Sequence, residues 1–438
     1  MTVVATKPDG QAANAFEAAR SRLPGVAAVA EQRQAAFDNY TRQGLPHRRV
    51  EDWKYTDLRV LMREVLPLAA APDHAHLARA ADALQLHAID GVRRLVLVDG
   101  VFVADLSDLA ELEPGLSIRP LREVLAAGEA LDDRWPAPDT ADAMVAFNAA
   151  LMTDGVVIEV GADITLQRPL QIVHVAAATE PASIVTRSLL RVGQNATATL
   201  VESFVAADGS TRYQLHDALH ITIAEGGRLD HLRLNEDAID AFHIASLFAS
   251  LHGQARYNAC ALTTGGGVSR YQGFVRFNGE GAEVTANGVN LLNGTQHADT
   301  TLFLDHAVPH CVSREVFRAV LDGRAHSVFQ GRIMVRPHAQ KTDAKMMTRA
   351  LLLSDEAEAD NKPELEIFAD DVTCGHGATT GALDDTLLFY LRARGLPEKE
   401  AQALLIQAFI GEAIESIVDD QLRALAIAVG ERWLEARA

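Results

Sequence analysis

The sequence predicts a mainly β protein in which a parallel β-helix stands between two helical ends. From Val156 to about Val372, apolar and polar residues alternate with the period of two that is typical of strands, and the helical period is almost absent. The expected strands recur every ~10 to 20 residues, over a length that an ordinary β-sandwich rarely reaches. Stacked rungs, by contrast, let a sheet grow without a single spherical core. No strict repeat motif can be counted, so a large sandwich or barrel stays an alternative on pattern alone.

Residues 1–155 are expected to form an N-terminal helical domain with some β structure. Residues 11–43 are rich in Ala, Gln, Glu and Arg with few helix breakers, and the helical period returns in HAHLARAADALQ and DTADAMVAFNAALM. Between these two stretches, RRLVLVDGVFVADL contains two short apolar runs joined by Asp99 and Gly100, which is a signal for a β-hairpin. The region therefore predicts a small α+β domain.

The β-helix core is expected to cover residues 156–380. Polar turn residues, mostly Gly, Asn and Asp, separate its short strands. The expected strands are VVIEV, LQIVHVA, SIVTRSLLRV, ATATLVESFVA, LHITIA, RLDHLRL, HIASLFASL, ARYNACALT, YQGFVRF, AEVTANGVNLL, TTLFLDHAV, SVFQGRIMV and ELEIFAD. The glycine run at residues 265–267 is not followed by a helix start that could bind phosphate, so we interpret it as a tight turn between rungs.

Residues 381–438 predict a C-terminal helical domain. A first helix lies in LDDTLLFYLRARG, where Asp384 suits the N-cap and Gly395 the position after the helix end. Pro397 suits the first position of a second helix. The apolar face of that helix is expected at Ala401, Leu404, Leu405, Ala408, Phe409 and Ile417. A third helix begins with two aspartates, and its expected apolar stripe comprises Leu422, Leu425, Ala426, Val429 and Trp433.

The charge balance and the cysteine content exclude several classes of protein. The 438 residues contain 40 Lys and Arg against 59 Asp and Glu, whereas binding to nucleic acid or to an anionic membrane needs a basic surface. The N-terminus lacks the pattern of a secretory signal, and no run approaches the ~20 apolar residues of a membrane span. Cys260, Cys311 and Cys374 are odd in number and far apart, which argues against a disulfide framework and for a reducing compartment. We therefore expect a cytoplasmic protein.

The sequence lacks the signatures of the common enzyme classes, including the Walker A, GxGxxG, GxSxG, HExxH and CxxC motifs. Two histidine groups have structural interpretations. His216 and His220 lie four residues apart in an expected strand, which favours a surface position or a stacked ladder over a pair of ligands. In DHAVPHC, His306, His310 and Cys311 are at least one well-placed ligand short of a zinc site. We interpret that group as a turn with a buried cysteine.

Cys374 and His376 form the sharpest candidate for a metal site. They lie two residues apart in DDVTCGHGATTG, which follows the last expected strand. If the strand persists through Gly375, both side chains project to the same side, and a thiolate and an imidazole suit iron or zinc. Two ligands are half a site, so a partner chain would have to supply the others. The alternative from the residues alone is that Cys374 packs inside while His376 caps a turn made by the glycines.

Several motifs together resemble one known family. They are AQKTDA, KPELEIFADDV, CGHGATTG and FYLRARGLPEKEA near the C-terminus, and HADTTLFLDHAVPHCVSREVFRAVLDGRAHSVFQGRIMV before them. These segments resemble the SufB/SufD family of iron–sulfur cluster assembly proteins. Near the N-terminus, GLPHRRVEDWKYTDL resembles the SufD branch of that family rather than the SufB branch. The resemblance covers nearly the whole chain.

The resemblance implies a fold and a function. The fold is a right-handed parallel β-helix between an N-terminal and a C-terminal helical domain, in agreement with the pattern above. The function is that of a scaffold subunit, which pairs with a SufB-like homologue through the two β-helices. The C-terminal helices, from Asp384 to about Ile417, are expected to bind a SufC-like ABC-type ATPase, while a cysteine desulfurase system delivers sulfur. ATP hydrolysis then belongs to the partner, and the chain itself is expected not to be an enzyme.

The resemblance also assigns the site. His376 matches a histidine that helps to hold a cluster at the interface of the two homologues, and Cys374 matches the cysteine beside it. Gly375 stands where serine is frequent, which adds backbone freedom. Three distant thiols cannot ligate a cubane cluster, so a transient iron–sulfur cluster would be shared with the partner. The resemblance leaves open whether a reduced flavin joins the complex and whether the isolated chain forms a homodimer.

Two other functions stay as alternatives. Right-handed β-helices also occur in carbohydrate-active enzymes, whose grooves carry several carboxylates or a calcium site, and an assay on pectin-like polymers would identify such an activity. The second alternative is a purely structural interaction protein without a role for metal. Reconstitution with iron and sulfide in the presence of the SufB-like partner would separate this alternative from a scaffold subunit.

Overall fold

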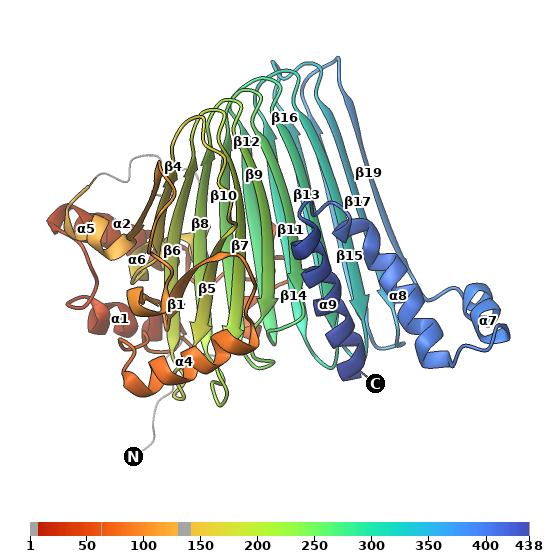
Figure 1. Ribbon diagram of the computed structural model, residues 1–438, viewed down its shortest axis with the longest axis horizontal. Coiled ribbons are helices and arrows are strands. Elements are labelled where there is room, and N and C mark those ends of the chain that lie inside the picture. The colour runs from red at the N-terminus through yellow and green to blue at the C-terminus, as the bar shows by residue number, and fades with distance from the viewer. Residues whose placement is uncertain (1–7, 63, 130–141, 438) are drawn as a thin grey trace.

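The computed structural model describes residues 8–62, 64–129 and 142–437 of the chain. Its centre is a β-solenoid in which the chain passes alternately through two facing sheets, and helices flank the solenoid near both ends of the chain (Figure 1). The predicted mainly β protein, with a parallel β-helix between helical ends, is confirmed.

The strands of the solenoid alternate between a 10-stranded and a 9-stranded sheet, and most neighbours within a sheet pair in parallel. The 10-stranded sheet contains β1 (Arg93–Val98), β2 (Val101–Phe102), β5 (Leu170–Ala176), β7 (Thr197–Ala206), β9 (Arg228–Glu236), β11 (Arg256–Thr263), β13 (Glu283–Leu292), β15 (Val312–Leu321), β17 (Asp343–Leu352) and β19 (Thr373–Gly381). The 9-stranded sheet contains β3 (Leu116–Pro120), β4 (Val156–Val160), β6 (Ser183–Val192), β8 (Gln214–Ile223), β10 (Phe242–Leu251), β12 (Val268–Phe277), β14 (His297–His306), β16 (His326–Val335) and β18 (Glu358–Ile367).

Side chains at equal positions of successive strands form columns, because the strands pair in register. Such columns point alternately into the solenoid and out of it. One inward column contains Ile221, Ala249, Val275 and Leu304, which are all buried in the largest apolar cluster. The core therefore extends along the solenoid as stacked apolar columns, which explains how so long a β region needs no spherical core.

Within residues 156–380, three strands lie where the sequence pattern assigned no strand. In β15 the inward positions include the polar Ser313 and Glu315, and in β15 and β17 the outward positions include apolar residues such as Val320 and Leu351, which blurs the alternation. β19 contains the CGHGATTG segment, for which the sequence left a continued strand and a turn made by the glycines open. The turn is wrong and the continued strand is confirmed, since β19 pairs with β17 along its whole length. Gly, Ala and Thr carry little strand signal of their own, so pairing with a neighbouring strand decides their conformation.

The hairpin predicted at Asp99 and Gly100 is confirmed. β1 and β2 pair antiparallel, and the two turn residues have φ values of 47° and 79°, which the tight two-residue turn requires. β1 also pairs in parallel with β5, and β3 pairs antiparallel with β4. Strands before residue 155 therefore extend both sheets of the solenoid, and the division of the chain near residues 155 and 380 stays a prediction.

Helices cover parts of the outer faces of both sheets. They are α1 (Pro8–Ala19), α2 (Ala27–Gln43), α3 (Leu58–Leu61), α4 (His74–Leu86), α5 (Leu121–Ala126), α6 (Ala143–Leu151), α7 (Asp385–Ala393), α8 (Glu398–Ile414) and α9 (Asp420–Arg437), with 3₁₀ helices at Glu51–Trp53 and Ala104–Leu106. α6 packs on β6 and β8, with α2 over it, whereas α4 packs on β1 and β5 and α8 packs on β13 and β15. The helices predicted within 11–43, 74–85 and 139–152 are present, although residues 139–141 lie outside the described residues.

The C-terminal helices follow the predicted caps more closely than the predicted faces. The Asp384 side chain accepts hydrogen bonds from the first turn of α7, and Gly395 has a φ of 94° just after that helix. Pro397 is the N-cap of α8, one position earlier than expected. The buried face of α9 agrees with its predicted stripe. The buried residues of α8 are Ala401, Ile406, Ile410, Ala413 and Ile414. Of the predicted face, Ala401 and Ile417 are buried, but Leu404 and Ala408 are exposed, so its centre is wrong.

The reason for the wrong face is that α8 carries apolar residues on most of its circumference. Leu404 is 46% exposed, whereas Ile410 and Ile414 pack on apolar side chains of β13 and β15. When apolar residues surround a helix, their periodicity does not single out one face. The sheet surface beneath α8 therefore selected the buried face.

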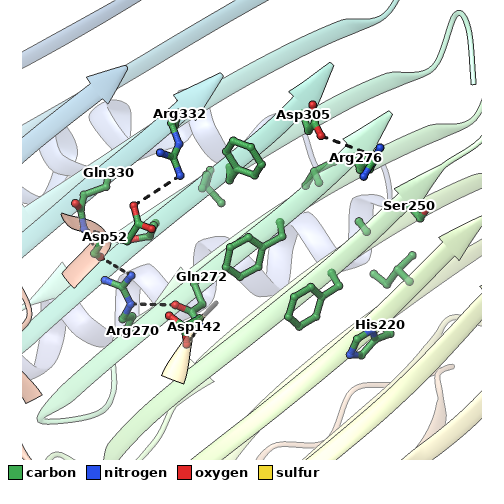
Figure 2. A pocket seen from close by; sticks show the side chains of 18 of the residues that line it. Asp52, Asp142, His220, Ser250, Arg270, Gln272, Arg276, Asp305, Gln330 and Arg332 are labelled. Carbon is green, nitrogen blue, oxygen red and sulfur yellow. Dashed lines mark hydrogen bonds and ion pairs between the residues drawn. The ribbon is translucent and has the colours of Figure 1, made fainter. Parts of the chain in front are cut away.

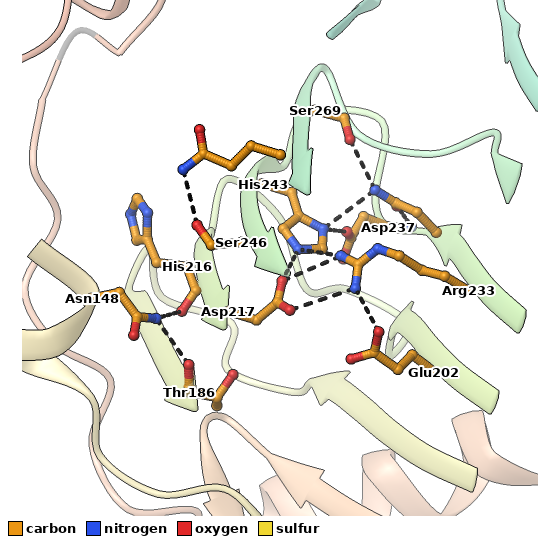
Figure 3. A network of polar contacts seen from close by, with 12 residues as sticks. Asn148, Thr186, Glu202, His216, Asp217, Arg233, Asp237, His243, Ser246 and Ser269 are labelled. Atoms are coloured by element: carbon orange, nitrogen blue, oxygen red, sulfur yellow. Dashed lines mark hydrogen bonds and ion pairs between the residues drawn. The ribbon is translucent and has the colours of Figure 1, made fainter. Parts of the chain in front are cut away.

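A network of charged and polar side chains crosses the interior between the two sheets (Figure 3). Arg233 of β9 pairs with Glu202 of β7 at 3.1 Å and with Asp217 of β8 at 3.3 Å. The ring of His243 in β10 lies between two carboxylates, with Nε2 at 2.5 Å from Asp217 and Nδ1 at 2.7 Å from Asp237. All five residues are buried. The network therefore connects strands of one sheet with strands of the other.

The charges of this network stabilise one another. Burial alone raises the pKa of the Asp217 carboxyl, but Arg233 and His243 outweigh that effect and hold this pKa below its usual value. Burial alone lowers the pKa of His243, but Asp237 and Asp217 outweigh it and raise this pKa. His243 is thus an imidazolium held between two carboxylates. Buried charges are tolerated where such partners surround them.

Candidate functional site

Cys374 and His376 lie on β19, the last strand of the 10-stranded sheet. Cys374 is in register with Ala344 of β17, and His376 with Met346. Because Ala344 and Met346 are buried in the apolar interior, the two candidate ligands lie in inward columns. Both therefore project from the same face of one strand, as the sequence suggested. The alternative in which His376 caps a turn is wrong, since the segment is a strand.

The two side chains differ in exposure. Cys374 is half-buried against the apolar interior, and burial raises the pKa of its thiol, so a metal ion would have to displace a proton from it. The imidazole of His376 is exposed and makes no hydrogen bond or ion pair with any described residue. The ring nitrogens of His376 are therefore accessible to a ligand or a partner chain.

The described part of the chain offers no third ligand at this position. Cys374 and His376 do not belong to any group of three or more His, Cys, Asp or Glu residues there that could hold a metal ion. The other two thiols lie elsewhere. Cys260 is buried beneath α8, where burial raises its pKa to about 12, and Cys311 is buried in the interior. The pair on β19 therefore offers two ligand-type side chains, and a cluster shared with a partner stays a prediction.

The strand edges next to this pair are open. β19 and β18 are the last strands of their sheets, and no other described strand pairs with their outer edges. Figure 1 shows β19 as the outermost strand at the C-terminal end of the solenoid. At the other end, by contrast, both sheets finish in short antiparallel pairs, β1 with β2 and β3 with β4. An open edge of this length is a surface to which strands of another chain can add.

α7 presents an exposed apolar surface close to this end. None of its residues is buried, and Phe389 and Tyr390 are 73% and 54% exposed. Figure 1 shows the helix standing away from the solenoid beyond α8. Exposed aromatic residues grouped on one element are typical of a contact surface for another protein.

A groove of about 1090 Å³ follows the outer face of the 9-stranded sheet (Figure 2). In its floor, the rings of His220, Phe248 and Phe274 stack on successive strands, with centroid distances of 4.6 and 5.2 Å. Phe303 continues the same column, and the guanidinium of Arg332 lies 4.8 Å from the centre of its ring. These residues occupy the seventh position of consecutive ten-residue strands. This regularity is present in the sequence, but it becomes visible only after the strands are aligned by register.

Two family models match this chain along almost its whole length. One describes the SufBD core domain of the SUF system for iron–sulfur cluster assembly and matches residues 174–409; the other describes the N-terminal region of SufBD proteins and matches residues 11–172. The chain belongs to the SufB/SufD family. The resemblance found in the sequence is thereby confirmed, and the family connects this chain with iron–sulfur cluster assembly.

Individual members of the SufB/SufD family are similar over most of their length. The iron–sulfur cluster assembly protein SufD of Escherichia coli is 32% identical over 414 residues, which cover 92% of each chain. A SufBD family protein of Synechocystis is 30% identical over 401 residues, or 89% of this chain and 87% of the relative. A SufBD family protein of Mycobacterium leprae is 31% identical over 71% of this chain and 80% of its own length. No helix within the described ranges has the length and apolar character needed to cross a membrane.

Residues 44–58 lie along the groove. This is the segment whose sequence resembles the SufD branch of the family. Its Trp53 is buried, donates from Nε1 to Asp142 at 2.8 Å, and lies under the guanidinium of Arg270 at 3.9 Å. Arg270 also donates to the carbonyl of Asp52 at 2.7 Å (Figure 2). Since Asp142 is the N-cap of α6, the segment connects the N-terminal helices with the 9-stranded sheet.

His216 and His220, the first histidine pair singled out in the sequence, pack against aromatic rings. His216 and His220 share the outward face of β8, as predicted, but both are buried rather than on the surface. His216 contacts Phe147 of α6, and His220 stacks on Phe248. The expectation of a stacked ladder is therefore confirmed for His220, and a surface position is wrong for both, because α6 and neighbouring rings cover them.

The DHAVPHC segment is a turn with a buried cysteine, as interpreted from the sequence. His306 ends β14, where its ring stacks on Phe277 with centroids 4.1 Å apart and its Nε2 lies 3.1 Å from the Ser313 hydroxyl. His310 lies in the following turn with a φ of 61°, and Cys311 is buried. The three side chains do not form a ligand group within the described residues.

Proposed function

We propose that this chain is the SufD-like subunit of a scaffold complex that assembles iron–sulfur clusters, and that it is itself not catalytic. In this complex, β18 and β19 pair with the solenoid of a SufB-like homologue, so that the two sheets continue from one chain into the next. The observation that carries the proposal is the coincidence of two features. The open edges of both sheets lie together at one end, and the candidate ligands Cys374 and His376 lie on one of these edges.

The proposed role of His376 is to donate an imidazole nitrogen to iron at this interface, with Cys374 as a second donor. Imidazole and thiolate are both suitable for iron, and the partner supplies the remaining donors. The exposure of His376 and its lack of partners among the described residues support this role. A cluster held between two chains can leave when the interface opens, which suits a scaffold whose cluster is cargo.

The proposed partner of the C-terminal helices is a SufC-like ABC-type ATPase. The exposed aromatic residues of α7 support this assignment, because α7 has no buried residue and leaves its apolar side chains uncovered. α8 and α9 have a different role, since they cover the apolar outer face of the 10-stranded sheet. The same proposal places the complex in the cytoplasm, with other proteins delivering sulfur to it and a reduced flavin bound in it. It also includes a homodimer of the isolated chain, formed through the same strand edges.

The test is co-expression of this chain with its SufB-like and SufC-like partners, followed by native mass and by iron and sulfide analysis of the purified complex. His376→Ala should leave the complex assembled but lower its affinity for the cluster by at least the ~10-fold that even a supporting residue of a metal site contributes. Cys374→Ala should have a smaller effect. His252→Ala, which removes an exposed histidine from a loop between β10 and β11, is the matched control. Unchanged iron and sulfide in the His376→Ala complex would refute the ligand role.

The contact with the ATPase is tested best by point substitutions. Deleting the three C-terminal helices would uncover the apolar side chains of the 10-stranded sheet, so loss of binding could follow from unfolding. Phe389→Ser and Tyr390→Ser alter only exposed side chains of α7 and should abolish co-purification of the ATPase. Ile427→Ser, at an exposed position of α9, is the control. Normal ATPase recovery with both α7 variants would show that α7 is not the contact.

A further inference from the structure

A second group of ligand-type side chains lies on the outer face of the 9-stranded sheet, at the beginning of its last two strands. His326 starts β16, and Glu358 is its register partner at the start of β18. Asp360 follows two positions later and therefore projects from the same face. One imidazole nitrogen and one oxygen from each carboxylate all lie within 4.8 Å of one another. Residues 8–62, 64–129 and 142–437 contain no other such group of three.

The charges in this group are not balanced by basic residues. Asp360 lies 2.9 Å from Nε2 of His326, and neither Asp360 nor Glu358 has a Lys or Arg at ion-pair distance within the described chain. Neighbouring carboxylates of the same face do have such partners. Arg270 pairs with Asp299, and Lys362 pairs with Glu364. Two negative charges therefore converge on a single imidazole.

A chain of hydrogen bonds fixes which nitrogen of His326 carries hydrogen. The hydroxyl of Thr56 donates to the carboxylate of Asp299, and a hydroxyl has only one hydrogen to give. The Thr56 oxygen must then accept the 2.9 Å bond from Nε2 of His297, which is buried. The Nδ1 atom of that neutral ring is left as an acceptor. It faces Nδ1 of His326 at 3.2 Å, so His326 donates from Nδ1.

With Nδ1 donating, the neutral form of His326 keeps a lone pair on Nε2 that faces Asp360, whereas an imidazolium would donate to it. In the neutral form, the lone pair and the carboxylate oxygen 2.9 Å away can both face one metal ion, which takes the place of the second ring proton. Histidines that bind metal ions share this arrangement, in which one ring nitrogen faces the ion and the other donates to a fixed acceptor. Here His297, held by Thr56, is that acceptor.

We propose that His326, Asp360 and Glu358 bind one divalent transition-metal ion, with His297 and Thr56 as positioning residues. One imidazole and two carboxylates, without a thiolate, suit ions of borderline hardness such as Zn²⁺, Fe²⁺, Co²⁺ or Mn²⁺. Three protein ligands leave coordination positions for water or for a further donor. The site lies on a different sheet from Cys374 and His376, and it does not rest on the proposed scaffold function.

The proposal also gives a role to the segment of residues 44–58. Thr56 belongs to this segment and is fully buried against the outer face of the solenoid, where its hydroxyl connects Asp299 to His297. Residues more than two hundred positions apart in the sequence thus cooperate to orient one imidazole. Such supporting residues typically contribute a factor of about 10 to 100 in metal affinity.

The test is a calorimetric titration of the isolated, full-length, chelator-treated chain with Zn²⁺ and, separately, with Co²⁺. We expect one ion per chain at this site. Glu358→Gln and Asp360→Asn should each weaken binding at least about tenfold. Glu356→Gln, which changes a neighbouring exposed carboxylate outside the group, should leave the affinity unchanged. Thr56→Val should weaken binding, and Thr56→Ser, which keeps the hydroxyl, should restore it.

Thermal unfolding of each chelated variant shows whether a loss of binding reflects the site or the fold. Glu358 is exposed, so Glu358→Gln keeps the test decisive even if a variant of buried Thr56 is unstable. Absence of saturable binding to the wild-type chain would overturn the proposal and leave a simple imidazolium–carboxylate pair. Unchanged affinity in Glu358→Gln and Asp360→Asn, or loss of the ion in His376→Ala instead, would overturn it as well.

Discussion

The middle of the solenoid and its C-terminal end each contain a histidine on an inward position of a strand, but the two side chains differ in burial and in partners. In the middle, His243 is buried and both of its ring nitrogens contact carboxylates (Figure 3). At the end, His376 is exposed and has no partner among the described residues. The first histidine stabilises the fold, whereas the second is free to bind something outside the chain. For these two histidines, the partners of the ring nitrogens, rather than the surrounding sequence, separate the structural residue from the candidate ligand.

Glu315 is a buried carboxyl group in the interior of the solenoid near its C-terminal end. It lies in the same inward column as Met346 and His376 and is only 1% exposed. In contrast to the carboxylates of the middle, it has no counter-ion at ion-pair distance in the described chain. Burial raises the pKa of its carboxyl to about 8. The interior near the open end therefore holds a neutral acid where the middle holds paired charges.

The largest effect is expected for His243→Ala. Removing His243 leaves the buried Asp237 without its counter-ion and Asp217 with Arg233 alone, and such losses cost about 3–5 kcal/mol of the free energy of unfolding. Urea unfolding of the isolated chain measures this cost. His252→Ala, at an exposed loop position, should be nearly neutral. Equal stability of the two variants would contradict the structural role of the network.

The same variant has a predicted pH dependence. Because the folded-state pKa of His243 is raised above 6.5, its stabilising contribution is fully present below that pH and is lost as pH rises through the folded-state pKa. The difference in stability between wild type and His243→Ala should therefore shrink in alkaline solution. A difference that grows there would mean that the ring is neutral in the folded chain.

Glu315→Gln is expected to raise the free energy of unfolding, by less than His243→Ala lowers it. In the wild type, the unfolded carboxyl ionises near pH 4.5 while the folded one stays protonated to about pH 8, so stability falls as pH rises between these values. The neutral amide removes this loss and should stabilise the isolated chain at pH 8 by about 1–4 kcal/mol, at ~1.4 kcal/mol for each unit of pKa. Unfolding should show no gain near pH 4.5. The same gain at both pH values would refute the assignment.

The smallest effect is expected for His376→Ala on the stability of the isolated chain. An exposed side chain without partners contributes within about 0.5 kcal/mol, in contrast to the large loss expected for His243→Ala. The thermal unfolding midpoint of the two variants, measured side by side, tests the comparison directly. A loss for His376→Ala as large as that for His243→Ala would show that both histidines are structural.

The sequence predicted those features that depend on near neighbours. Alternation within ten residues predicted most strands, Asp99 and Gly100 predicted a hairpin, and Asp384 predicted the start of α7. The two-residue spacing of Cys374 and His376 predicted that they share a face, which holds because both belong to one strand. Each of these features follows from backbone geometry within a single turn or strand, so the local residues are sufficient to determine it.

The tertiary structure decided which residues meet between strands. His326 and Asp360 are 34 positions apart, and their contact depends on the register of β16 with β18, which the lengths of the intervening strand and turns set. Likewise, β19 is a strand because β17 lies beside it, and α8 buries Ile410 because an apolar sheet lies beneath it. A one-residue change in the register of β18 would turn Asp360 to the other face of the sheet. Local sequence does not determine that register, because it results from packing all the rungs together.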